Sequence, residues 1–139
     1  MAQKWTSAQV EQYLRKILSK DGYSLTPPRG NGETGADIIA RKGEQALFIE
    51  AIGYKSSPPA RSKDFYEVFF RAISRLKNGA TKCIIALPSQ FEVGMPQRVN
   101  QYGLAWERLG DAFPELNIWF VDIEEQTHSE HSWNRWDRH

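Results

Sequence analysis

The sequence predicts a single α/β domain in which helices cover both faces of a mixed β-sheet. Two observations support this prediction. Apolar residues recur at helical spacing in three segments, and short apolar runs bounded by glycine, proline or asparagine lie between them. In chain order these elements are α-β-β-β-α-β-α-β. The three consecutive strands predict an antiparallel meander, and the alternating elements after it predict a βαβαβ-like half.

The first half of the chain holds the first helix and the meander. We expect a helix over residues 7–20, because its apolar residues have helical spacing and Ser7 can cap its first turn. Two consecutive prolines make the next segment extended. Two strands follow, joined by a tight turn, at residues 36–42 (ADIIARK) and 46–54 (ALFIEAIGY).

The second half alternates helices and strands. A loop with two prolines precedes a helix over about residues 63–77, which Ser62 caps. The strand at 81–88 is a continuous apolar run, which is typical of a strand covered on both faces. A helix over 96–113 and a strand over 116–124 follow.

The composition is typical of a globular protein with one domain. Of the 139 residues, 40% are hydrophobic and 25% are charged. No apolar run is long enough to span a membrane, and no secretory signal is visible. The one cysteine, Cys83, excludes an intramolecular disulfide, and we expect a cytoplasmic location. We place the domain at residues 1–125 and a C-terminal tail at 126–139, whose tryptophans suggest that it docks.

Positive charge is concentrated in the middle of the chain. Residues 41–82 contain nine Lys and Arg residues against four acidic residues, while 107–139 contain eight acidic residues against three arginines. A basic segment could contact phosphates. Alternatively, the two segments face each other or are both solvated. The residues predicted to contact a nucleic-acid backbone are Arg29 in the glycine-rich loop and Arg61, Arg71 and Arg75.

Two acidic residues form the candidate site. Asp37 opens one strand, and Glu50 lies near the middle of the next, so pairing about the turn at 42–44 brings them close if they share a face. Two close carboxylates repel each other unless a proton or a cation lies between them. Mg²⁺ takes oxygen ligands and keeps water that could attack a phosphodiester. Alone, Asp37 could be a turn residue and Glu50 an exposed one, but Phe48 and Ile52 flank Glu50 on its own face.

The two segments around these acids, GAD and IEA, resemble the PD-(D/E)XK nuclease superfamily, whose members have the restriction-endonuclease-like fold. The resemblance covers roughly residues 7–90. It implies a metal-dependent nuclease that acts on DNA. In such an enzyme Asp37 and Glu50 would bind Mg²⁺ or Mn²⁺. Some members of the superfamily add an acidic residue on the first helix, which corresponds here to Glu11.

The sequence departs from the family's motif at one position. The motif lysine would lie two residues after the second carboxylate, where this chain has Ile52. Another cation must then replace that lysine in an active site. Lys55 is the nearest candidate, although a regular strand points it to the wrong face unless a bulge at Gly53 reverses it. Lys63 and Arg71, on the polar side of the following helix, are the other candidates.

The leading hypothesis is therefore a Mg²⁺-dependent DNA nuclease with a variant site. The alternative is a catalytically inactive module of the same fold that binds nucleic acid or a protein. In that case four tryptophans could build a partner or homodimer surface, namely Trp106, Trp119, Trp133 and Trp136. A structural subunit of a larger assembly is a third option. A nucleoside triphosphate site is not expected, because the glycine-rich loop lacks the Gly-Lys-Ser/Thr ending of a P-loop.

Overall fold

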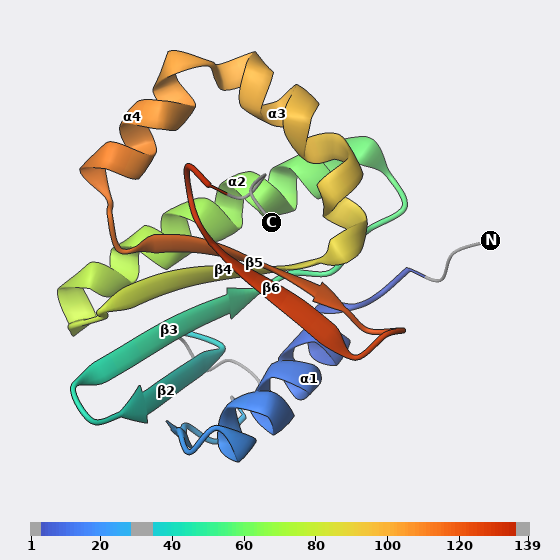
Figure 1. The fold of residues 1–139 in the computed structure, drawn as a ribbon. Helices are drawn as coiled ribbons and strands as arrows, with labels where there is room; N and C mark the ends of the chain where they lie inside the picture. Colours follow the sequence, from blue (N-terminus) through green and yellow to red (C-terminus); the bar gives the residue numbers. More distant parts are fainter. Residues whose placement is uncertain (1–3, 29–34, 136–139) are drawn as a thin grey trace.

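The computed structural model describes residues 4–28 and 35–135. In these residues six strands form one sheet, and their order across the sheet follows the sequence (Figure 1). The strands are β1 (Ser24–Leu25), β2 (Ile38–Lys42), β3 (Gln45–Ala51), β4 (Lys82–Pro88), β5 (Leu116–Asp122) and β6 (Thr127–Ser132). The helices are α1 (Ser7–Lys20), α2 (Pro58–Ser74), α3 (Met95–Tyr102) and α4 (Leu104–Ala112), with 3₁₀ helices at Arg75–Asn78 and Ser89–Gly94.

The sheet is mixed, and this confirms the predicted fold class. β1, β2 and β3 pair antiparallel, β3, β4 and β5 pair parallel, and β6 returns antiparallel to β5. One face is covered by α1 and the other by α2, α3 and α4 (Figure 1). Each face has its own buried cluster, which includes Leu14 of α1 and Ile49 of β3 on one face and Phe65 of α2 and Ile85 of β4 on the other. Among the described residues, no helix is long and apolar enough to cross a lipid bilayer.

α1 has the bounds that the sequence predicts, but its cap differs. Thr6, and not Ser7, is the N-cap residue. The Thr6 hydroxyl accepts a hydrogen bond from the Gln9 backbone N–H at 3.2 Å, and the Gln9 side chain accepts one from the Thr6 N–H at 2.9 Å. This reciprocal capping box satisfies two N–H groups at the start of the helix.

α2 begins earlier than the sequence predicts. It starts at Pro58, and Ser57 caps it instead of Ser62. We expected the prolines to exclude regular structure. They fit the first turn of a helix, however, because the N–H that proline lacks would have no partner there. α2 continues into the 3₁₀ helix at Arg75–Asn78, which ends at Gly79 with a left-handed φ of 89°.

Two further differences lie in the second half of the chain. The single helix predicted over 96–113 is broken into α3 and α4 at Gly103, which has φ 52° and ψ −121°. Glycine adopts this conformation without the strain that a side chain would cause. In addition, residues 127–132, inside the segment predicted as a tail, form β6 and complete the sheet.

Three of the four tryptophans considered for a partner surface lie in the core instead. Trp106, Trp119 and Trp133 are at most 3% exposed, so the surface considered for them above is wrong; Trp136 lies outside the described residues. The rings of Trp106 and Trp133 stack with centroids 3.9 Å apart. Each indole N–H donates to the backbone carbonyl of the other residue, at 3.2 and 2.8 Å. These contacts fix Trp133, the residue that follows β6, to α4.

Candidate active site

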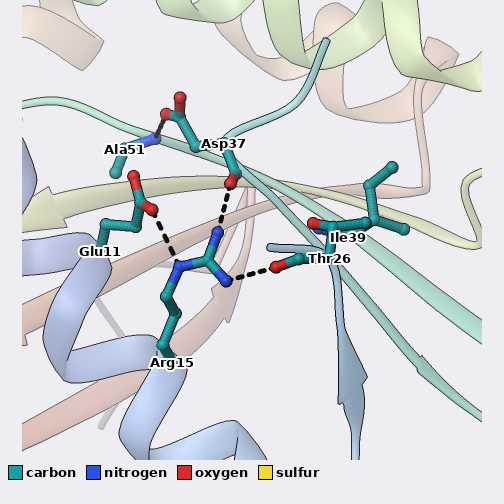
Figure 2. Close-up of polar contacts among 6 residues, drawn as sticks. All are labelled: Glu11, Arg15, Thr26, Asp37, Ile39 and Ala51. Carbon is teal, nitrogen blue, oxygen red and sulfur yellow. Dashed lines mark hydrogen bonds and ion pairs between the residues drawn. The ribbon is translucent and has the colours of Figure 1, made fainter. Parts of the chain in front are cut away.

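The β2–β3 hairpin brings Asp37 and Glu50 to the same place. Ile38 pairs with Ile49, so the residues one step further along, Asp37 and Glu50, are neighbours across the hairpin. Oδ2 of Asp37 accepts a hydrogen bond from the backbone N–H of Ala51 at 2.8 Å (Figure 2). Beyond the last paired residues of β2 and β3, the side chain of Asp37 therefore accepts a hydrogen bond that a backbone carbonyl would accept in a longer hairpin. This is the cross-strand approach that the sequence predicts, and the chemical roles of the two acids remain predictions.

Arg15 of α1 fixes the entrance to β2. Its guanidinium donates to the backbone carbonyls of Thr26 and Asp37, and its Nε lies 2.9 Å from a carboxylate oxygen of Glu11 (Figure 2). Thr26 also accepts a hydrogen bond from the N–H of Ile39. Glu11, predicted as an additional metal ligand, thus orients the arginine that holds Asp37. In residues 4–28 and 35–135 no three His, Cys, Asp or Glu side chains form a group that could hold a metal.

Glu50 is buried and bears two ion pairs. Its side chain is 1% exposed, with Nε of Arg75 3.1 Å from one carboxylate oxygen and Nε of Arg71 3.5 Å from the other. Burial raises the pKa of Glu50, and the carboxylate of Asp37 raises it further, while the two arginines lower it. The net effect is a raised pKa. Because Asp37 and Glu50 are neighbours across the hairpin, their carboxylates repel each other when both are ionised.

The residue at the position of the family's motif lysine, Ile52, lies in the core. Ile52 is 5% exposed and packs with Phe65, Val68 and Phe69 of α2. It shares a face with Glu50, as the alternation along the strand predicts, whereas Leu47, Ile49 and Ala51 face α1. An apolar contact with α2 therefore replaces a cation at this position.

Lys55 and Lys63 have carboxylate partners other than Glu50. β3 ends at Ala51, so Lys55 lies beyond the strand, and its Nζ is 3.2 Å from Asp64. Lys63 is largely exposed and lies 4.0 Å from Glu67. Of the three cations considered as substitutes for the motif lysine, Arg71 is the one for which the structure records a contact with Glu50.

Gly53 has a packing role in place of the bulge considered above. A Cβ atom on Gly53 would lie 2.8 Å from the backbone nitrogen of Ser7 and 3.0 Å from the carbonyl oxygen of Trp5. The N–H of Tyr54 donates to that same carbonyl at 2.8 Å. The segment before α1 therefore lies directly against the end of β3, and this contact requires a residue without a side chain.

A groove of about 660 Å³ opens where these segments meet. Its lining includes the chain from Ala51 to Ser57, the segment before α1, and residues of α2. Three cationic side chains border it, Lys4, Lys55 and Arg71, together with one acidic side chain, Asp64. Arg71 thus reaches both the groove and Glu50, and it links the buried carboxylate to a cavity that solvent can enter.

The four arginines predicted to contact DNA have different surroundings. Arg71 and Arg75 pair with Glu50. Arg75 was predicted only as a DNA contact, although its spacing of four residues from Arg71 already indicates that both lie on one side of the helix. Arg61 donates to the carbonyls of Lys55 and Ser56. Arg29 lies outside the described residues.

The donors at the hairpin are compatible with a hard divalent cation. Asp37 and Glu50 supply carboxylate oxygens, which Mg²⁺ and Mn²⁺ accept, and a shared cation would relieve their repulsion. Arg71 and Arg75 already offset part of the charge of Glu50. The site therefore fits a cation held by two acids with arginines beside it.

Comparison with known families shows which family the chain belongs to. Residues 2–97, more than half of the chain, match the restriction endonuclease family Mrr_cat. The chain belongs to this family. Membership in Mrr_cat confirms the resemblance to restriction endonucleases, and the matched region contains both Asp37 and Glu50. No curated protein matches the chain significantly.

Two solved structures share the fold of this Mrr_cat family member. One is an XisH family protein from Nostoc punctiforme PCC 73102, with 16% identity and a TM-score of 0.55 over 89% of this chain and 98% of that one. The other is an fdxN element excision controlling factor protein from Anabaena variabilis, with 16% identity and a TM-score of 0.51 over 90% and 98%. At this identity the likeness concerns the fold.

Proposed function

We propose that this protein is a divalent-metal-dependent DNA nuclease in which Arg71 takes over from the motif lysine. One observation carries the proposal: Arg71 contacts the buried carboxylate of Glu50 and also borders the basic groove. Membership in a restriction endonuclease family supports DNA as the substrate. The description of one structural neighbour as an excision controlling factor is also compatible with a nucleic-acid partner.

The residues have separate roles in this proposal. Asp37 and Glu50 would hold Mg²⁺ or Mn²⁺, which when bound supplies a water of lowered pKa for attack on the phosphodiester. Arg71 donates hydrogen bonds to the phosphate and stabilises the charge that develops on it. Because a guanidinium stays protonated, Arg71 orients and stabilises but does not remove a proton. Lys4 and Lys55 attract the DNA backbone to the groove.

The first prediction tests this mechanism by the nicking of supercoiled DNA with Mg²⁺ or Mn²⁺. We expect Asp37→Asn to abolish nicking, and Arg71→Met to lower its rate by about 100-fold or more, as for loss of one donor to a developing charge. Arg108→Met removes an exposed positive charge on α4 and should leave the rate unchanged. Melting temperatures of all variants establish that they fold. Nicking by the Asp37→Asn variant at the wild-type rate would refute the mechanism.

A second candidate is a nuclease-fold module that binds DNA without cutting it. Ile52 packed in the core and Glu50 paired with two arginines favour this candidate. The two candidates differ in their response to metal. Stabilisation by Mg²⁺ or Mn²⁺ in calorimetry, lost in Asp37→Asn, supports the nuclease. DNA binding with no effect of metal, together with a higher melting temperature for Glu50→Gln, supports the module.

A further inference from the structure

A second, smaller hollow lies between α2 and α3. Its volume is about 280 Å³, and its polar lining includes Arg61, Ser62, Gln97, Arg98 and Gln101. Two of these residues are arginines, and none of the described residues that line the hollow is acidic. Its lining also includes an aromatic residue of the active-site groove, Tyr54. The two cavities are therefore neighbours, and one extended ligand could enter both.

Arg98 lines this hollow, and one of its hydrogen-bond donors has no partner among the described residues. Its Nε is shielded from solvent, and no residue that the structure describes accepts a hydrogen bond from it. The guanidinium lies over the ring of Phe65, 4.8 Å from the ring centroid. Buried polar groups without a partner are rare, because losing the hydrogen bonds of water costs free energy. A planar guanidinium presents a fork of donors that matches the oxygens of a phosphate.

Arg61 is held in place on the other side of the hollow. Its Nη1 donates to the carbonyl of Lys55 at 2.7 Å and to that of Ser56 at 3.1 Å, and its guanidinium lies 4.5 Å from the centroid of the Tyr54 ring. Both hydrogen bonds use the same nitrogen. No carboxylate among the described residues forms an ion pair with Arg61 or Arg98. The hollow therefore has two positioned arginines whose charge is not neutralised by an ion pair of this kind.

We propose that this hollow binds a backbone phosphate of a DNA strand that lies in the active-site groove. Arg98 and Arg61 donate to the phosphate oxygens, and Gln97, Gln101 and Ser62 line the site. This inference rests on the proposed function, since it assumes that DNA occupies the groove. It adds an anchoring point on α3, away from Asp37 and Glu50, which would set the direction in which the strand leaves the groove.

The test is DNA binding measured by fluorescence anisotropy over a range of salt concentrations, in EDTA so that no strand is cut. We expect Arg98→Gln to weaken binding about tenfold, as for the loss of a hydrogen bond to a charged group. We also expect the slope of log affinity against log salt to fall by about 1. Gln101→Glu keeps the packing of Arg98 and should weaken binding by repulsion. The matched controls are Arg108→Gln and Asn100→Asp, which change charge outside the hollow.

A second measurement uses inorganic phosphate alone as the probe. In the wild-type protein, the NMR signal of the Arg98 Nε–Hε group should shift on titration with phosphate. If both hollow variants bind DNA like their controls while the wild type binds well, the phosphate site is wrong and the proposed function stands. A shift with phosphate but unchanged DNA affinity would assign the hollow to a free anion and overturn the strand contact. If the wild type neither binds nor cuts DNA, the proposed function itself fails, and this inference fails with it.

Discussion

At the scale of single residues, Glu50 defines the site because its charge is buried and shared. Arg75 is the closer partner, with its side chain 14% exposed, whereas that of Arg71 is 46% exposed. An ion pair in a solvent-shielded place is costly to break from one side, since the remaining charge has no substitute partner. A pair open to water contributes little. We therefore expect the two arginines to have different roles: Arg75 stabilises the fold, and Arg71 acts on a ligand in the groove.

This difference can be measured by chemical denaturation. Arg75→Met should lower the free energy of unfolding by about 3 kcal/mol, because it leaves Glu50 buried with one partner. Arg71→Met should lower it by less than about 1 kcal/mol. In a Glu50→Gln background, where no buried charge is left unpaired, the loss caused by Arg75→Met should shrink. Equal losses from the two arginines in the wild-type background would contradict this division of roles.

The sequence reveals part of this site and conceals the rest for a physical reason. The approach of Asp37 and Glu50 follows from hairpin pairing, which local sequence specifies well. Which cationic side chain replaces the motif lysine does not follow from local sequence. It depends on where β3 ends and on how far α2 extends, and element boundaries are the least certain part of any prediction from sequence. Lys55 is near Glu50 along the chain, but Arg71 and Arg75 are brought to it by tertiary packing.

At the scale of elements, most differences between the predicted and the observed structure lie where helices start or break. The sequence analysis predicted Ser62 as the cap of α2, whereas in the structure the hydroxyl of Ser57 caps it by accepting a hydrogen bond from the N–H of Ala60. Gly103 lies inside a continuous apolar period, so nothing in the spacing signals a break. β6 lacks the alternation of large apolar residues that marks a strand, because it lies at the edge of the sheet and is only partly covered. β2, β3, β4 and β5 have stronger apolar patterns and lie where the sequence predicts strands.

The contact between Gly53 and the segment before α1 gives a prediction at this scale. Gly53→Ala would place a Cβ atom 2.8 Å from the backbone of Ser7, so one of the two segments must move. We expect a loss of about 1–3 kcal/mol in unfolding free energy, typical of overpacking, and faster hydrogen exchange at the N–H of Tyr54. The control is Gly94→Ala, where a Cβ atom would meet nothing within 4 Å. Equal stability of the two variants would disprove the close approach.

At the scale of the whole molecule, the question is whether the C-terminal residues belong to the domain. Trp133→Ala would remove a large side chain that is 2% exposed and stacked on Trp106. We expect it to cost about 3–5 kcal/mol of unfolding free energy and to abolish the circular dichroism signal of the coupled indoles. Arg135→Ala, an exposed neighbour, should have no effect. A loss below 1 kcal/mol for Trp133→Ala would mean that residues 126–139 are a dispensable tail.

The stacked tryptophans also bear on the order in which the protein is made. Because the strands lie across the sheet in the order of the sequence, each new strand can join the edge left by the one before it as the chain emerges. The helices α2 and α4, however, pack on a core that lacks Trp133 until β6 has been synthesised. Domains generally fold as units during synthesis. The nascent chain therefore carries an incomplete core, with Trp106 unpaired, until almost the last of the residues described here have left the ribosome.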